Sequence, residues 1–322
     1  MKRSITAILF MVSVLLAFIM GMFYGGSKND SLLSPVGQAQ KELPLLEYSF
    51  ENLAARGGVH SEIKVEGDKF YFTGYGKRIS GQIKKPEGTP KGIVVMARGY
   101  VDKEIYQTGM GTKNAAAFYS KNGYITYAPD FSGYGESDDE STDVLEARLA
   151  KPAEILDLLA SFATDLPIYL WGHSNGGQIM LSVAEILGMR EPITSADSQV
   201  RGVTLWAPVS KPFPYSVLYY TDEASDSGKW LRGQIAKLEQ DYDVYNYSVD
   251  RYLDKINIPL QIHQGSADEA VPMRWSNQLV ESLNKLDKEV RYYTYPGADH
   301  NMRPVWNTVV ERDLEFVASI EN

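Results

Sequence analysis

A serine between glycines is the first feature of this sequence that could carry chemistry. The segment Gly172–Gly176 reads Gly-His-Ser-Asn-Gly and fits the pattern G-x-S-x-G. An apolar run at 168–171 precedes the segment, and a helix-type pattern follows it. Such a strand–turn–helix connection exposes a serine hydroxyl, and glycines on both sides allow the strand and the helix to approach closely. The spacing predicts that Ser174 is a nucleophile.

A serine nucleophile needs a base to accept its proton. The chain has four histidines, at positions 60, 173, 263 and 300. His300 follows the last predicted strand and precedes the final predicted helix, so it lies on a loop that can reach the serine. His263 ends a predicted strand and is interpreted as a packed residue. We therefore expect His300 to be the base, with a solvated loop histidine as the alternative.

The base needs a carboxylate that orients its ring. Asp268 follows the predicted strand one before His300 and is the preferred candidate. Glu269 is its nearest competitor, and Asp299 is a weaker one because adjacent residues seldom face each other. The resulting chain order is Ser174, Asp268, His300.

Two backbone N–H groups are expected to stabilise the negative charge that develops during attack. One belongs to Asn175, and the other is expected at Tyr100, after the predicted strand 92–97. Gly99 lets the backbone turn toward the substrate. Arg98 is expected either to reach the substrate pocket or to form a salt bridge.

Short apolar runs alternate with amphipathic stretches after residue 43, which is typical of an α/β fold. The prediction is a mostly parallel eight-stranded sheet with helices on both faces. The expected strands span 69–73, 79–84, 92–97, 124–128, 168–171, 203–206, 260–263 and 290–295. The expected helices span 113–121, 144–163, 176–187, 273–286 and 305–320.

One connection, between the strands at 203–206 and 260–263, is longer than a crossover requires,. Its section 211–252 is rich in aromatic residues and is interpreted as a small helical lid. Tyr215, Tyr219 and Tyr220 are candidate substrate contacts, since binding pockets are lined mainly by apolar and aromatic side chains. The alternative is that these rings only fix the insertion to the body.

The amino-terminal residues 1–26 carry a membrane signal. The uncharged apolar run 5–24 follows Lys2 and Arg3 directly and is long enough to cross a bilayer,. An uncleaved anchor is favoured over a cleaved signal peptide, followed by a polar tether at 27–42 and a catalytic domain at 43–322. The positive-inside rule then places that domain outside the cytoplasm, membrane-anchored or, after cleavage, secreted.

Composition excludes several functions. The chain has 41 acidic and 32 basic residues, a net charge of −9, so nucleic acid is not an expected partner,. The absence of cysteine excludes thiolate zinc sites and iron–sulfur clusters,. The histidines lack ligand-like spacing, so neither a metal nor a cofactor is predicted. Membrane contact is expected only through the amino-terminal segment, and the oligomeric state stays open.

Together these residues give the chain a resemblance to the α/β-hydrolase superfamily over residues 70–318. The chain looks most like the catalytic domain of prolyl oligopeptidases and acylaminoacyl peptidases, and like dienelactone-hydrolase-like esterases. The segments that carry the resemblance are 130–137, 172–177, 265–272 and 295–300. Arg98-Gly99 departs from the His-Gly that is frequent in the group, and about 45 residues leave no room for the amino-terminal propeller of the large peptidases.

The resemblance implies a serine hydrolase that cleaves carboxylic esters through an acyl-enzyme intermediate. The alternative is a serine peptidase that acts on short peptides, with the acidic lid residues Asp222, Glu223 and Asp226 receiving the peptide's amino terminus. A third possibility, from a different class, is a tethered binding protein on an inactive hydrolase fold.

Overall fold

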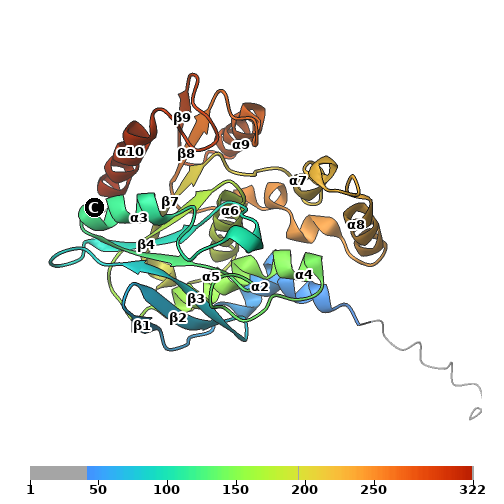
Figure 1. Ribbon diagram of the computed structural model, residues 1–322, viewed down its shortest axis with the longest axis horizontal. Coiled ribbons are helices and arrows are strands. Elements are labelled where there is room, and N and C mark those ends of the chain that lie inside the picture. The colour runs from blue at the N-terminus through green and yellow to red at the C-terminus, as the bar shows by residue number, and fades with distance from the viewer. Residues whose placement is uncertain (1–41, 195, 321–322) are drawn as a thin grey trace, which may run out of the picture. The chain divides into compact units, whose positions relative to one another are not determined.

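The computed structural model describes residues 42–194 and 196–320. These residues form one sheet with the strand order β1-β2-β3-β5-β4-β6-β7-β8-β9 (Figure 1). The pairs β1/β2, β2/β3 and β3/β5 are antiparallel and the remaining pairs are parallel. The strands are β1 Lys64–Glu66, β2 Lys69–Gly74, β3 Lys77–Lys84, β4 Gly92–Ala97, β5 Tyr124–Pro129, β6 Ile168–His173, β7 Val200–Trp206, β8 Leu260–Gly265 and β9 Val290–Tyr295.

The sheet therefore has one strand more than the eight predicted. The additional strand is β1, which has three residues, all exposed. A strand this short with no buried side chain leaves no apolar alternation in the sequence. It pairs with β2 through the hairpin partners Val65 and Phe70.

The five predicted helices are present, one of them divided, and a helix at 50–56 was not predicted. The predicted helix 144–163 is split into α4 and α5 at Ala150, and Pro152 lies in the first turn of α5, where proline is tolerated,. The helices are α2 Phe50–Arg56, α3 Lys113–Lys121, α4 Val144–Leu149, α5 Lys151–Ala160, α6 Asn175–Gly188, α7 Tyr215–Leu218, α8 Lys229–Asp241, α9 Met273–Lys285 and α10 Trp306–Ser319.

Helices cover both faces of the sheet, as the sequence predicts. In β4, Ile93 and Val95 join an apolar cluster with residues of α2, α5 and α6. Val94 and Met96 point the other way and join residues of α3, α9 and α10. Because successive side chains of a strand point to opposite faces, the continuous apolar run of β4 is explained by burial on both sides,.

The insertion between β7 and β8 is largely helical and contains α7 and α8 (Figure 1). A third apolar cluster joins it to α4 and to the 3₁₀ helix η1, Pro44–Tyr48. Val217, Ile235 and Leu238 contribute from the insertion, and Leu145 and Leu149 contribute from α4. The insertion is thus packed against η1 and α4.

The predicted membrane segment 1–26 and nearly all of the predicted tether 27–42 lie outside the described residues. Among the residues that the structure does describe, no helix combines the length and the apolar character needed to cross a membrane.

Candidate active site

Ser174 lies at the sharp turn between β6 and α6. Its backbone has φ 56° and ψ −120°, a conformation that is costly for a residue with a side chain,. A Cβ on Gly172 would lie 2.4 Å from the Gly176 carbonyl oxygen, and one on Gly176 would lie 2.0 Å from the Ala97 oxygen. Both glycines are therefore required by close packing. The strained strand–turn–helix connection has the geometry that the sequence predicts for a nucleophile elbow.

The loops after β8 and β9 bring a carboxylate and an imidazole together. His300 Nδ1 lies 2.9 Å from Asp268 Oδ2, and the two side chains are 20% and 0% exposed. A carboxylate accepts a hydrogen from Nδ1, which leaves Nε2 as the ring's proton acceptor. Glu269 is exposed and Asp299 bonds within its own loop, so the structure pairs His300 with Asp268 rather than with either competitor.

Asp268 is held by several donors besides His300. The N–H groups of Ala270 and Val271 donate to Oδ1 at 2.9 and 2.8 Å, and Gln264 Nε2 donates to Oδ2 at 3.0 Å. Burial acts to raise the pKa of Asp268, but His300 and these donors outweigh burial and lower it,. The carboxylate is therefore ionised at neutral pH and fixed in orientation.

Three hydrogen bonds fix the loop that carries His300. Asp299 Oδ1 accepts hydrogen bonds from the N–H groups of Asn301 and Arg303, both at 2.9 Å. The N–H of Ala267 donates to the Ala298 carbonyl at 3.0 Å, which joins the acid loop to the base loop. The geometry of the Asp268–His300 pair is thus set by backbone bonds between neighbouring loops.

His173 connects the elbow to the His300 loop, a contact that the sequence reasoning missed. Its Nε2 lies 2.9 Å from the His300 carbonyl oxygen, and the two rings are 4.6 Å apart. Because a carbonyl only accepts, Nε2 is the donor. Burial, followed by the charge of His300, lowers the pKa of His173 to about 4, so the ring is neutral at pH 7. Its position directly before Ser174 was the only available sequence signal.

The loop after β4 lies against the nucleophile. A Cβ on Gly99 would be 3.1 Å from Ser174 Cβ, so the chain approaches the serine here as closely as a glycine allows. The side chain of Tyr100 is 74% exposed, and its hydroxyl donates to Asp102 at 2.9 Å. The loop therefore offers its backbone to the site, whereas the Tyr100 ring is turned to solvent.

Arg98 occupies a different place from the expected one. Its side chain is 5% exposed and donates to the carbonyls of Gly99 at 2.9 Å and Asp130 at 3.2 Å. The guanidinium lies over the rings of Tyr106 and Tyr134, 4.3 and 4.0 Å from their centroids. The expectation that Arg98 contacts substrate or forms a salt bridge is therefore wrong. Its guanidinium is buried and donates to two backbone carbonyls instead.

The three lid tyrosines gather on one partner. Tyr215, Tyr219 and Tyr220 lie 6.1, 4.7 and 6.2 Å from the buried ring of Trp275, at the start of α9. The Tyr220 hydroxyl also donates to the Ala270 carbonyl of the acid loop at 3.1 Å. The tyrosines therefore fix the lid to the body, and Tyr215, 45% exposed, still offers part of its ring.

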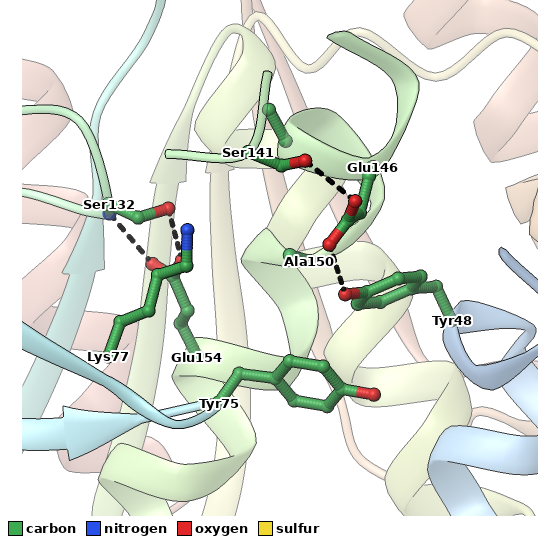
Figure 2. A pocket seen from close by; sticks show the side chains of 9 residues that line it. Tyr48, Tyr75, Lys77, Ser132, Ser141, Glu146, Ala150 and Glu154 are labelled. Atoms are coloured by element: carbon green, nitrogen blue, oxygen red, sulfur yellow. Dashed lines mark hydrogen bonds between the residues drawn. The ribbon is translucent and has the colours of Figure 1, made fainter. Parts of the chain in front are cut away.

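A cavity of about 170 Å³ lies away from these residues, between β3 and α4–α5 (Figure 2). Figure 2 shows two carboxylates on its wall with their partners: Glu146 accepts from Tyr48 and Ser141, and Glu154 accepts from Ser132. None of its lining residues belongs to the Ser174, Asp268 and His300 set. The cavity is therefore not the substrate pocket of the candidate site.

The parallel sheet, the strained elbow and the acid–base pair on the loops after β8 and β9 define an α/β hydrolase. Comparison with known families is consistent with this class. The sequence model of the prolyl oligopeptidase family matches residues 111–319, and the chain belongs to that family.

Individual relatives are distant. Mouse monoglyceride lipase is 24% identical over 73% of this chain and 84% of its own length. A monoacylglycerol lipase of Mycolicibacterium smegmatis is 23% identical over 70% of this chain and 87% of its own length. Among solved structures, Est1E from Butyrivibrio proteoclasticus, determined with ferulic acid bound, has a TM-score of 0.55 at 19% identity and covers 78% of this chain and 98% of that one. A puromycin-hydrolyzing peptidase of Mycobacterium tuberculosis has a TM-score of 0.57 at 16% identity, over 81% of this chain and 39% of that one.

Proposed function

We propose that the protein hydrolyses carboxylic esters through an acyl-enzyme intermediate. The observation that carries the proposal is the Asp268–His300 pair at 2.9 Å, held beside the elbow of Ser174 by the His173 contact. The monoglyceride lipase and the monoacylglycerol lipase among the similar proteins are named for ester substrates, which supports esters over amides.

In the proposed mechanism, Ser174 Oγ attacks the acyl carbon while His300 Nε2 takes the hydroxyl proton. Collapse of the tetrahedral intermediate breaks the bond to the alcohol oxygen, which leaves with the proton from His300. Water then attacks the acyl-serine by the same route and releases the acid. Asp268 keeps Nδ1 protonated and stabilises the imidazolium that forms in both steps.

The N–H groups of Asn175 and Tyr100 are the proposed donors to the oxyanion. Arg98 supports this assignment through the planar peptide that joins Gly99 to Tyr100. The carbonyl and the N–H of a trans peptide point in opposite directions. Because Arg98 fixes the Gly99 carbonyl, it also fixes the direction of the Tyr100 N–H. Arg98 is therefore a positioning residue, and the exposed part of Tyr215 is the lid surface offered to the acyl group.

The test is hydrolysis of a p-nitrophenyl ester series, from acetate to palmitate, by the full chain in detergent. Alanine p-nitroanilide serves as the amide, and Ser174→Ala is the control variant. We expect ester turnover that disappears in Ser174→Ala, with anilide cleavage at least a hundredfold slower. Equal ester turnover by Ser174→Ala would refute the mechanism.

Membership of a peptidase family makes amide hydrolysis the second candidate. It would use the same serine, acid and base. Two of the three acidic lid residues suggested for binding a peptide amino terminus already have partners: Asp222 lies 3.6 Å from Arg232, and Asp226 accepts from the N–H groups of Gly228 and Trp230. Anilide turnover comparable to that of the ester would place this candidate first.

We also propose that the catalytic domain lies outside the cytoplasm, tethered by residues 1–26. The uncharged run 5–24 behind Lys2 and Arg3 supports this placement,. Added protease should digest the domain in intact cells that produce the full chain. Protection until the cells are lysed would refute the orientation, and recovery of the chain in the medium would indicate cleavage.

A further inference from the structure

A small cavity is lined by the proposed oxyanion residue Asn175 and by two positively charged side chains. It measures about 40 Å³ and lies where α4, α5, α6 and the lid meet. Arg148 and Lys151, one helical turn apart, are both part of its wall. In a chain with a net charge of −9, two cations beside the start of the nucleophile helix need an explanation.

Both cations have neutral partners. Arg148 Nη2 donates to Gln178 Oε1 at 2.6 Å, and Lys151 Nζ donates to the Ala147 carbonyl at 3.1 Å. In the described part of the chain, neither forms a salt bridge within 4.0 Å. Half-buried cations usually have a carboxylate partner, since removal from water is costly. Here the hydrogen bonds to neutral groups replace only part of the solvation that each cation loses on burial.

The nearest carboxylates are committed elsewhere. The charge of Lys151 is attracted by the carboxylates of Glu154 and Glu140. It is repelled by the guanidinium groups of Arg98 and Arg148. Both oxygens of Glu154 accept from Ser132, and burial raises the pKa of Glu154. Glu140 is paired with Lys103. Burial lowers the pKa of Arg148 to about 10, so its guanidinium stays charged at neutral pH.

The position of the pair relates it to the reaction. Gln178, which accepts from Arg148, lies one turn after Ser174 on α6 and also donates to Ser216 of the lid at 3.2 Å. The amino terminus of α6 adds its own positive field to the same corner. A substrate whose reacting carbonyl lies at Asn175 can therefore extend a negative group toward Arg148 and Lys151.

We infer that the enzyme selects esters that carry a second, anionic group, a carboxylate or a phosphate, which Arg148 and Lys151 bind. The inference rests on the proposed ester hydrolysis and names its substrate class. Charge-assisted hydrogen bonds of this kind favour the anionic substrate by about ten- to a hundredfold.

The test compares matched substrates on the full chain. Mono(4-nitrophenyl) glutarate and its neutral methyl ester place the charge on the acyl side. Glycerol 3-phosphate butyrate and butyrylglycerol place it on the alcohol side. We expect kcat/KM to favour the anionic member of at least one pair by about tenfold or more. The responding pair identifies the preferred combination: a carboxylate on the acyl side or a phosphate on the alcohol side.

Two variants assign the preference to these residues. Arg148→Gln and Lys151→Met should each reduce the ratio of kcat/KM values about tenfold, whereas Lys121→Gln, at the exposed end of α3, should preserve it. In wild type, a ratio of kcat/KM values near one for both pairs would overturn the inference. Ester turnover that depends on Ser174 would still support the proposed function in that case. If no ester is hydrolysed, calorimetric titration of Ser174→Ala with both pairs decides, because equal affinity for the two members of each pair would overturn the inference.

Discussion

Two aspartate–histidine pairs in this molecule have the same separation and different surroundings. His300 Nδ1 lies 2.9 Å from Asp268, and His263 Nε2 lies 2.9 Å from Asp313. The first pair lies on loops after β8 and β9. The second lies inside the molecule, between β8 and α10, with both side chains 0% exposed.

The two pairs differ in whether the second nitrogen of the imidazole ring already has a partner. His300 is 20% exposed, and its pairing with Asp268 leaves Nε2 for the nucleophile. His263 has partners at both nitrogens, because Nδ1 lies 2.7 Å from the Tyr295 hydroxyl. Trp206 also donates to Asp313 at 3.0 Å. An aspartate–histidine pair thus becomes an acid–base device only when one ring nitrogen is accessible, and otherwise it ties elements together.

The largest expected effect separates the pairs by activity. Asp268→Asn should lower kcat about 10³- to 10⁴-fold, because an amide at this position favours the wrong tautomer of His300. Steady-state kinetics on a p-nitrophenyl ester, with circular dichroism as the folding control, measures the loss. If Glu269→Gln loses activity to this extent and Asp268→Asn does not, the acid is assigned to the wrong residue.

Asp313→Asn should act on stability instead. It puts an amide in place of a carboxylate that accepts from His263 and Trp206, and should lower the free energy of unfolding by about 2 kcal/mol, as expected when a buried donor loses its acceptor,. Its kcat, measured well below the midpoint of unfolding, should change less than tenfold. A thousandfold loss of kcat in a folded Asp313→Asn would remove the distinction between the two pairs.

A third prediction concerns the oxyanion loop, whose geometry depends on another buried charge. Arg98→Met should lower kcat about ten- to a hundredfold with little change in KM. The Tyr100 N–H is then no longer held in direction, and its donation matters only when negative charge develops in the transition state. Met keeps the length of the side chain and removes the donors to the Gly99 carbonyl. A rise in KM at constant kcat would return Arg98 to the role of substrate contact.

Strands, helices and the chain order of the candidate catalytic residues could be predicted because each depends on a local sequence pattern. The strands 92–97 and 290–295 and the helix 113–121 have the predicted bounds, because continuous apolar runs and helical periodicity are local,. The order of Ser174, Asp268 and His300 also followed from the loops that carry them. The burial of His263 is confirmed by its exposure of 0%.

Contacts between distant segments could not be predicted in the same way. His173 and the carbonyl of His300 are 127 positions apart, and Arg98 meets the carbonyl of Asp130 32 positions away. Nothing in the neighbouring residues specifies either partner. The polar residues that orient the site are therefore the part of it that required the structure.

The smallest predicted effect concerns His173, which resembles neither His300 nor His263 because it donates to a carbonyl and has no carboxylate. Its pKa falls from about 6.5 in the unfolded chain to about 4 in the fold, so between these values the unfolded state binds more protons,. Stability due to His173 is therefore present above pH 6.5 and is lost as the pH falls toward 4. The loss between pH 7 and pH 5.5 should be about 1.2 kcal/mol in urea unfolding. His173→Gln, which keeps a donor, should show a pH dependence smaller by this amount, and an unchanged slope would mean that the histidine is not held neutral.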